Sequence, residues 1–532
     1  MSTGEKFLHL ADTLTDRLNP ILVKETRQAL KSRQFIITFM LLLTVAWLIS
    51  VFGIIMNGPA IEYGSAGRMF FAFYAGVLGF AALFVVPFGA FRSMLNERDY
   101  NTFELLSIST LSPRQIVSGK LLSSLVQVLI YYSAIAPFIA FTSLLQGFDL
   151  PLVILILSLG LFWSLFVSTV AIMLSTLSKS RQWQAINTIG IIGLLLWQMG
   201  MSFAFGGAAL SENIPFDSEE FWWGMCSVLI GVSSYLLLAQ QIAVSRLTFE
   251  SDNRSSGIRI ISTIQFCLIW LGTLIFAMWY GVTYIEGEAV FAFSVGSCLH
   301  LVIAGLVFST ESEFVSRRVR RSVPPSKFKR LLFAPWMPGG RRGLLLLTLH
   351  LAVLIAISCL PTWPQWFADN VMPLPVWDDW IGNAVTAMAL YIFIYVGFGA
   401  AIGRWGQKLT PEFRPAHARV LTLMLSALAM IVPYLPMLLG FERRLNSSSL
   451  LFVTNPLTTL EKICYSGSAW SNSTPQEASL LVYVLSIAAG FVLLLNLKAM
   501  IQGVSEVLTW QSAADQDSSV SAKAETEAAF SD

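Results

Sequence analysis

Long uncharged apolar windows alternate with short polar segments along the chain. Twelve windows each span 19 residues or more, and a helix needs about 20 residues to cross the hydrocarbon layer of a bilayer. The twelve windows are residues 35–56, 69–91, 121–145, 151–177, 183–206, 222–244, 260–285, 289–309, 343–361, 381–403, 420–440 and 478–497. The pattern predicts an all-α integral membrane protein with about twelve transmembrane helices.

The composition excludes a soluble globular protein. Hydrophobic residues make up 55% of the chain and charged residues only 12%, whereas soluble domains carry about 25% charged residues. The net charge of +2 gives no reason to expect a nucleic-acid partner. We expect a multi-pass protein of the cell membrane that is surrounded by the lipid bilayer.

Lysine and arginine are distributed unevenly among the segments between the windows. With the N-terminus in the cytoplasm, thirty of the 34 basic residues fall in cytoplasmic segments, and the other four are Arg68, Arg443, Arg444 and Lys462. Cytoplasmic loops of membrane proteins carry such an excess of positive charge. The distribution predicts that both termini are cytoplasmic.

Residues 1–34 precede the first window and end in a basic amphipathic stretch. Asn19, followed by a proline, suits the N-cap of a helix. Lys24, Arg27 and Lys31 recur at helical spacing on one face, and apolar residues fall largely on the other. The stretch predicts an amphipathic helix in the cytoplasmic interface of the bilayer. The alternative is a basic flank that only sets the topology of the first span.

The polar segment 92–120, between the second and third windows, contains two helix starts. Asn101 is followed three residues later by Glu104, and Ser112 is followed three residues later by Gln115. This is the spacing of the capping box, in which the two residues satisfy each other's backbone N–H groups. These helix starts predict a short helix with apolar side chains on the cytoplasmic side, where a soluble partner could bind it.

The chain carries no sequence signature of nucleotide or metal chemistry. Its Gly119-Lys120 pair lacks the first glycine of the phosphate-binding pattern Gly-x-x-x-x-Gly-Lys-Ser/Thr, and Leu121 follows it. There is no His-Glu-x-x-His and no cysteine pair at metal-binding spacing. Among Asp, Glu, Lys, Arg and His, the windows contain only His300 and His350. We expect no enzyme activity and no cofactor in this chain, and a membrane interior poor in ion ligands.

Two stretches of the N-terminal half resemble a known family, the membrane subunits of ATP-binding-cassette exporters of the type-two permease class. The first stretch reads Asn19-Pro20-Ile21-Leu22-Val23-Lys24-Glu25-x-Arg27-Gln28. The second reads Glu97-Arg98-x-x-x-Thr102-x-Glu104-Leu105-Leu106-Ser107, with Leu111-Ser112-Pro113 and Gly119-Lys120 after it. The resemblance covers about residues 17–249, which hold six of the twelve windows.

The resemblance implies a function and a set of contacts. In that family an amphipathic helix precedes the first span, and a coupling helix between the second and third spans docks on a separate ATPase subunit. Here it implies that the ATPase contacts are Arg98, Thr102, Phe103, Glu104, Leu105 and Leu106. ATP and Mg²⁺ would be bound by the partner subunit. The implied role is export across a bacterial cytoplasmic membrane, and a second permease copy is a further partner that the resemblance leaves open.

The resemblance implies a permease core at 35–249, with a coupling loop at 92–120, and it does not extend to the rest of the chain. Residues 250–510 hold six further windows and a basic cytoplasmic loop at 310–342. Residues 511–532 are rich in Ser, Ala, Asp and Glu without apolar periodicity, which predicts a disordered cytoplasmic tail.

Two other classes of function stay open from the sequence. A membrane glycosyl- or acyltransferase acting at the outer face would use acids such as Glu62, Asp378 and Asp379, which have no histidine or basic partner nearby in the sequence. A secondary carrier is disfavoured because such carriers place ionisable residues inside the membrane.

Overall fold

The computed structural model of the chain is helical in all of its regular elements. It describes residues 19–58, 66–99, 111–145, 147, 149–177, 181–211, 214–279, 287–358, 379–410, 412–435, 453–464 and 475–510. No strand occurs among these residues. The termini, at 1–18 and 511–532, and the segment 100–110 lie outside the described residues.

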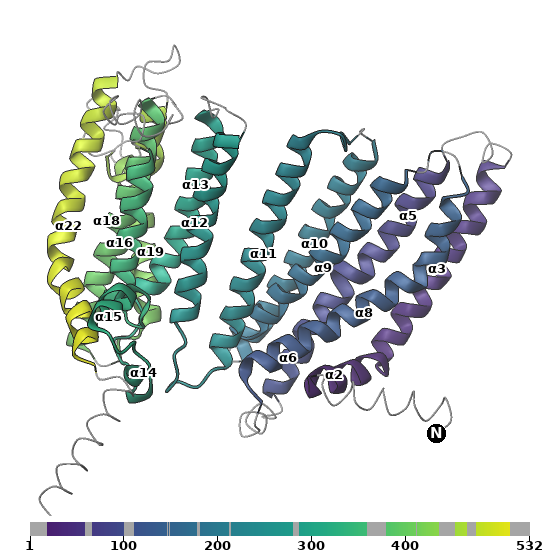
Figure 1. The fold of residues 1–532 in the computed structure, drawn as a ribbon, viewed down its shortest axis with the longest axis horizontal. Helices are drawn as coiled ribbons and strands as arrows, with labels where there is room; N and C mark the ends of the chain where they lie inside the picture. Colours follow the sequence, from purple (N-terminus) through teal and green to yellow (C-terminus); the bar gives the residue numbers. More distant parts are fainter. Residues whose placement is uncertain are drawn as a thin grey trace, which may run out of the picture. The chain divides into compact units, whose positions relative to one another are not determined.

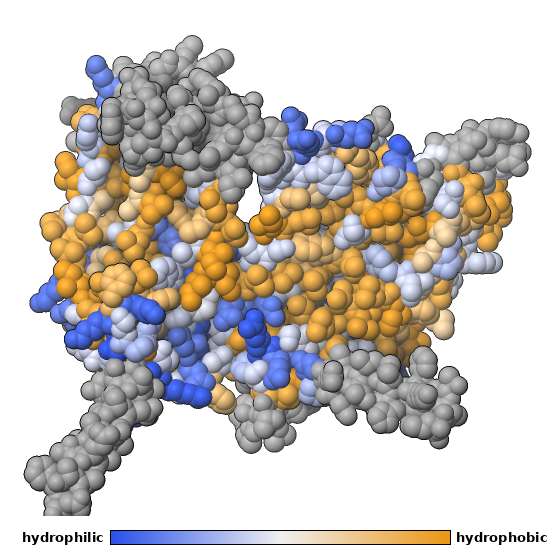
Figure 2. Space-filling view, in the orientation of Figure 1, coloured by the Kyte–Doolittle hydropathy of each residue, from blue (hydrophilic) through white to orange (hydrophobic). Residues whose placement is uncertain are grey.

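Within the described residues, eleven helices are long and apolar enough to cross a membrane. This confirms the all-α, polytopic membrane fold. The remaining predicted window, 260–285, coincides with α12 (Ser256–Trp279), which contributes a shorter apolar helix at Ser256–Gly272. Hydrophobic residues cover the sides of the helices, and hydrophilic residues gather toward their ends (Figure 2).

The chain divides into two compact units, Met1–Thr248 and Phe249–Asp532, which we call the N-terminal unit and the C-terminal unit. The division falls within one residue of the border expected between the permease-like core and the further six windows. Helices of each unit run side by side (Figure 1).

Among its described residues, the N-terminal unit contains the short helix α2 and six long helices. Its elements are α2 (Pro20–Leu30), α3 (Arg33–Asn57), α5 (Ala66–Phe80), η1 (Ala81–Val85), α6 (Val86–Asp99), α8 (Pro113–Thr142), α9 (Leu150–Ser175), α10 (Arg181–Ser211) and α11 (Glu219–Leu247). The second window is one continuous helix in which α5 and α6 are joined by the π-helical turn η1.

The π turn is held by side chains from neighbouring helices. A π turn displaces the regular backbone hydrogen bonds of a helix and leaves carbonyl oxygens available to other donors. The Ser164 hydroxyl of α9 donates to the Ala82 carbonyl at 2.6 Å, and the Gln198 amide of α10 donates to the Leu83 carbonyl at 2.8 Å. These bonds fix α5 and α6 against α9 and α10.

The C-terminal unit packs around α16, α18 and α22. Its elements are α12, α13 (Gly287–Ser309), α14 (Arg317–Arg321), α15 (Lys327–Phe333), η2 (Ala334–Trp336), α16 (Gly340–Ser358), α18 (Asp379–Leu409), α19 (Pro415–Ile431), η4 (Val432–Tyr434), α21 (Pro456–Cys464) and α22 (Pro475–Thr509). Gly399 and Gly403 of α18 lie against Thr422 and Ala418 of α19, so small residues allow a close helix crossing.

The loop predicted at 310–342 is folded in the C-terminal unit. The fully buried Arg259 of α12 donates to the backbone carbonyls of Pro335 at 3.1 Å and Gly339 at 3.0 Å, and it pairs with Glu311. A buried guanidinium needs hydrogen-bond acceptors or a negative partner, and both terminal nitrogens of Arg259 have them. Arg259 therefore ties the segment between α13 and α16 to the start of α12.

Candidate functional site

The structure describes the frame of the predicted coupling helix. Thr102, Phe103, Glu104, Leu105 and Leu106 lie outside the described residues. Arg98 belongs to the last turn of α6, but its side chain also lies outside the description. The coupling helix therefore stays a prediction, and the site can be built from α6 and α8, which flank it, and from α2.

The start of α8 is fixed by the capping box that the sequence predicts. The Ser112 hydroxyl accepts from the Gln115 backbone N–H at 3.3 Å, and the Ser112 N–H donates to the Gln115 side chain at 2.9 Å. Proline occupies the first helical position, where its missing N–H costs nothing. The chain therefore enters α8 in a defined direction directly after the segment 100–110.

Helix α2 lies directly on the first turns of α8. Asn19 caps α2 through its Oδ1, which accepts from the Ile21 N–H at 3.0 Å, as the sequence predicts. The Asn19 Nδ2 donates across to the Gln115 carbonyl of α8 at 2.6 Å. A Cβ added to Gly119 would come within 2.9 Å of the Ile21 side chain. The absence of a side chain at 119 thus permits this close approach.

The predicted basic face of α2 points outward. Lys24, Arg27 and Lys31 are exposed, and the buried residues of the helix are Ile21 and Glu25. A buried carboxylate needs a positive partner or hydrogen bonds, because burial removes it from water. That partner comes from α8.

Lys120 of α8 is the centre of an ion-pair cluster that joins α2, α6 and α8. Its side chain is only 2% exposed, and its Nζ lies 3.0 Å from the Glu25 carboxylate and 3.2 Å from that of Glu97. Nζ also donates to the Ser93 hydroxyl at 2.8 Å, and that hydroxyl donates to Glu25 at 2.9 Å. Lys24 completes the cluster from the exposed side, at 3.5 Å from Glu97.

The charges of this cluster balance each other. Burial alone would raise the pKa of Glu25, but the positive charge of Lys120, with hydrogen bonds from Lys120 and Ser93, brings the pKa below its usual value. Glu25 is therefore held as a carboxylate. Two carboxylates and two ammonium groups leave the cluster with no net charge.

An apolar layer continues the contact between the same helices. It is formed by Ile21, Ala90, Met94, Ile116, Val117 and Leu121, together with Ile172, Ala243 and Leu247 of α9 and α11. The apolar layer and the ion-pair cluster act on the same three helices. The apolar layer therefore packs α6 and α8 against α2, α9 and α11.

The side chains of the acids named for a membrane transferase fall outside the part of the chain that the structure describes. Glu62 and Asp378 lie outside the described residues, and Asp379 is the first residue of α18 with its side chain outside the description. Among the described residues, no group of three or more His, Cys, Asp or Glu side chains is placed to hold a metal ion.

Sequence reasoning missed the ion-pair cluster. Glu25, Glu97 and Lys120 all occur within the stretches that carry the family resemblance, but nothing local shows that they meet. The available signal was Lys120 itself, a charge directly at the edge of an apolar window.

Comparison of the chain with protein families, curated proteins and solved structures finds no match.

Proposed function

We propose that this chain is the membrane-spanning permease subunit of an ATP-driven transporter of the ATP-binding-cassette type, an exporter of the bacterial cytoplasmic membrane. A separate ATPase subunit binds ATP and Mg²⁺, and both termini of the permease lie in the cytoplasm. The observation that supports this most is the Lys120 cluster, because it fastens together the two helices that flank the segment 100–110.

In this proposal the segment 100–110 is the docking point of the ATPase. Leu105 and Leu106 supply the apolar contact, and Arg98 and Glu104 supply polar contacts. Thr102 and Phe103 belong to the same docking helix. ATP binding in the partner moves this helix, and the motion passes to α6 and α8 through the backbone.

In this proposal the ion-pair cluster keeps α2, α6 and α8 together when the docking helix moves. Separating Lys120 from both Glu25 and Glu97 would leave its buried ammonium group without a carboxylate partner, which costs about 3–5 kcal/mol. The three helices therefore move as one body, together with the helices packed on the apolar layer. Lys120, Glu25 and Glu97 are positioning residues in this account.

Capture of the ATPase tests the proposed docking point. The double variant Leu105→Asp/Leu106→Asp should lose a co-purifying subunit that carries the Gly-x-x-x-x-Gly-Lys-Ser/Thr pattern, because two carboxylates cannot enter an apolar groove. A tagged full-length chain, purified in mild detergent, gives the measurement through mass spectrometry of the bound subunits.

A matched control separates docking from general damage. Leu409→Asp changes an 82% exposed leucine at the end of α18 and should retain the ATPase. Undiminished capture by the Leu105→Asp/Leu106→Asp variant would show that the ATPase docks elsewhere.

A further inference from the structure

The short helix α15 in the C-terminal unit exposes its apolar residues and buries an arginine. Phe328 is 74% exposed, and Leu331 and Leu332 are about half exposed, whereas Arg330 is only 5% exposed. In a helix that faces water the opposite arrangement is expected. The apolar face of α15 therefore requires surroundings other than bulk water.

Arg330 fixes α15 in this orientation through three backbone carbonyls. Its Nε donates to Pro324 at 2.7 Å, one terminal nitrogen donates to Trp510 at 2.6 Å, and the other donates to Pro325 at 2.9 Å. Because every nitrogen of the guanidinium is satisfied, rotation of the helix would leave buried donors unpaired. The outward position of Phe328, Leu331 and Leu332 is thus built into the fold.

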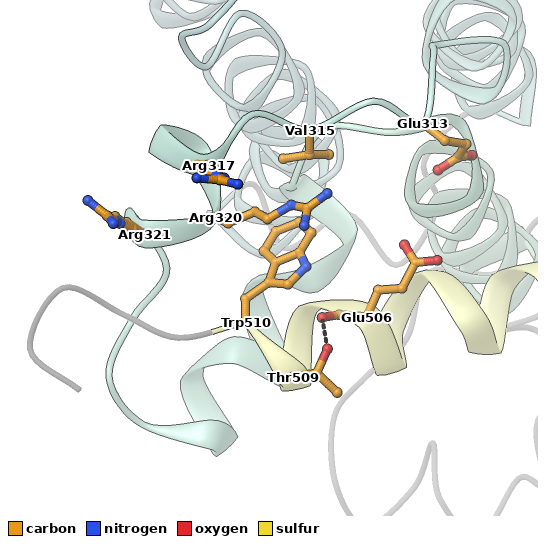
Figure 3. Close-up of a pocket in the computed structure, with 8 residues that line it drawn as sticks. All are labelled: Glu313, Val315, Arg317, Arg320, Arg321, Glu506, Thr509 and Trp510. Atoms are coloured by element: carbon orange, nitrogen blue, oxygen red, sulfur yellow. Dashed lines mark hydrogen bonds between the residues drawn. The ribbon is translucent and has the colours of Figure 1, made fainter. Parts of the chain in front are cut away.

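The neighbouring helix α14 presents a dense group of arginines. Only Val319 is buried in it, and the arginines at 317, 318, 320 and 321 are exposed. Among the described residues, Arg318 pairs with Asp252 at 2.9 Å. The other three line a pocket of about 600 Å³, together with Glu313, Val315, Glu506, Thr509 and Trp510. Figure 3 shows these arginines on α14, Glu506 and Thr509 on α22, and Trp510 directly after the end of α22.

The two acids of the pocket are already paired from outside it. Arg341 lies 2.7 Å from Glu506 and 3.8 Å from Glu313, and Arg342 lies 3.4 Å from Glu506 and 4.0 Å from Glu313. Neither arginine lines the pocket. Because Arg341 and Arg342 neutralise the two carboxylates, the charge that the pocket presents is the positive charge of the α14 arginines.

We propose that α14 and α15 form a binding surface for anionic phospholipids of the surrounding membrane. Arg317, Arg320 and Arg321 hold the phosphate of the headgroup, because guanidinium groups donate two parallel hydrogen bonds to phosphate oxygens. Phe328 and Leu332 enter the boundary between headgroups and acyl chains. A basic cluster next to a membrane span, combined with exposed apolar side chains, has the charge and polarity of such a lipid surface.

The apolar side chains distinguish a lipid from other anions. A free phosphate would use the arginines alone and would leave Phe328, Leu331 and Leu332 exposed to water. An anionic phospholipid satisfies both parts of the surface. This proposal is independent of the ATPase and its docking point, since all of its residues belong to the C-terminal unit.

Titration of the purified full-length chain with phosphatidylglycerol and phosphatidylcholine, followed by native mass spectrometry, tests the charge contribution. The wild type should prefer phosphatidylglycerol, and the variant Arg320→Gln/Arg321→Gln should lose about tenfold in affinity for it. The control Lys408→Gln/Arg414→Gln removes two exposed charges, one from the last turn of α18 and one from the N-cap of α19, and should change that affinity less than about twofold.

The apolar contribution has its own variant. Phe328→Gln/Leu332→Gln alters exposed side chains only, so the fold should persist while phosphatidylglycerol affinity falls. Inorganic phosphate at millimolar concentration should not displace the lipid.

Three results would overturn the proposal. The first is no preference of the wild type for phosphatidylglycerol. The others are an equal loss of affinity in the Lys408→Gln/Arg414→Gln control and displacement of the lipid by inorganic phosphate.

Discussion

Lys120 is buried between two carboxylates, so removing its charge should destabilise the fold. The variant Lys120→Met leaves Glu25 and Glu97 without their buried positive partner, so unfolding free energy should fall by about 3–5 kcal/mol. Denaturation of the purified chain in mixed micelles, followed by circular dichroism, measures this loss.

Two further variants separate the charge effect from packing. Lys24→Met removes a lysine of the same cluster that is largely exposed, so its effect should stay below about 1 kcal/mol. Combining Lys120→Met with Glu25→Gln and Glu97→Gln also removes the two carboxylates that Lys120 compensates, and should recover most of the loss. Equal losses for Lys120→Met and Lys24→Met would show that Lys120 is not the centre of the cluster.

At the level of elements, the contact of α2 with α8 depends on Gly119. Gly119→Leu would force side-chain atoms into Ile21 and Asn19, so α2 should detach from α8 and its backbone amides should exchange hydrogen faster. Hydrogen-exchange mass spectrometry of residues 20–30 provides the measurement.

Gly76→Leu is the matched control for this change. Apart from the adjoining residues and backbone of α5 itself, no described atom lies within 4 Å of a Cβ added at Gly76, so exchange in α2 should stay as in the wild type. Slow, unaltered exchange of α2 in the Gly119→Leu variant would contradict the packing of these helices.

The elements also show which features a sequence can predict. The starts of α2 at Asn19 and α8 at Ser112 follow from capping residues a few positions apart, so local patterns sufficed. The burial of Glu25 depends on Lys120, 95 positions away, and was not foreseen. The π turn η1 likewise depends on bonds from Ser164 and Gln198, which are distant in sequence.

Helix α15, which exposes apolar residues and buries Arg330, also could not be predicted from local sequence. Its sequence, Lys-Phe-Lys-Arg-Leu-Leu-Phe, combines basic and apolar residues and says little about which face is buried. The buried face is determined by the hydrogen bonds of Arg330 to the carbonyls of Pro324, Pro325 and Trp510. Trp510 is 180 positions from Arg330 in the sequence. Hydropathy windows predicted where the chain crosses the membrane, but they carry no information about these contacts.

For the whole molecule, the two compact units have different roles in this account. The N-terminal unit carries the helices that flank the segment 100–110 and the Lys120 cluster that joins them to α2. The C-terminal unit carries the α14–α15 surface that we assign to anionic lipids. The resemblance to ATP-binding-cassette permeases concerns the N-terminal unit, so the ATPase should depend on that unit for docking.

ATP turnover by the complex purified from native membranes tests the central proposal most directly. The wild-type chain, isolated with its bound subunits, should hydrolyse ATP through a partner that carries the Gly-x-x-x-x-Gly-Lys-Ser/Thr pattern. The same preparation of Leu105→Asp/Leu106→Asp should have lost both the partner and the activity. An intact wild-type chain that purifies without any ATP-hydrolysing subunit would contradict the proposed permease function.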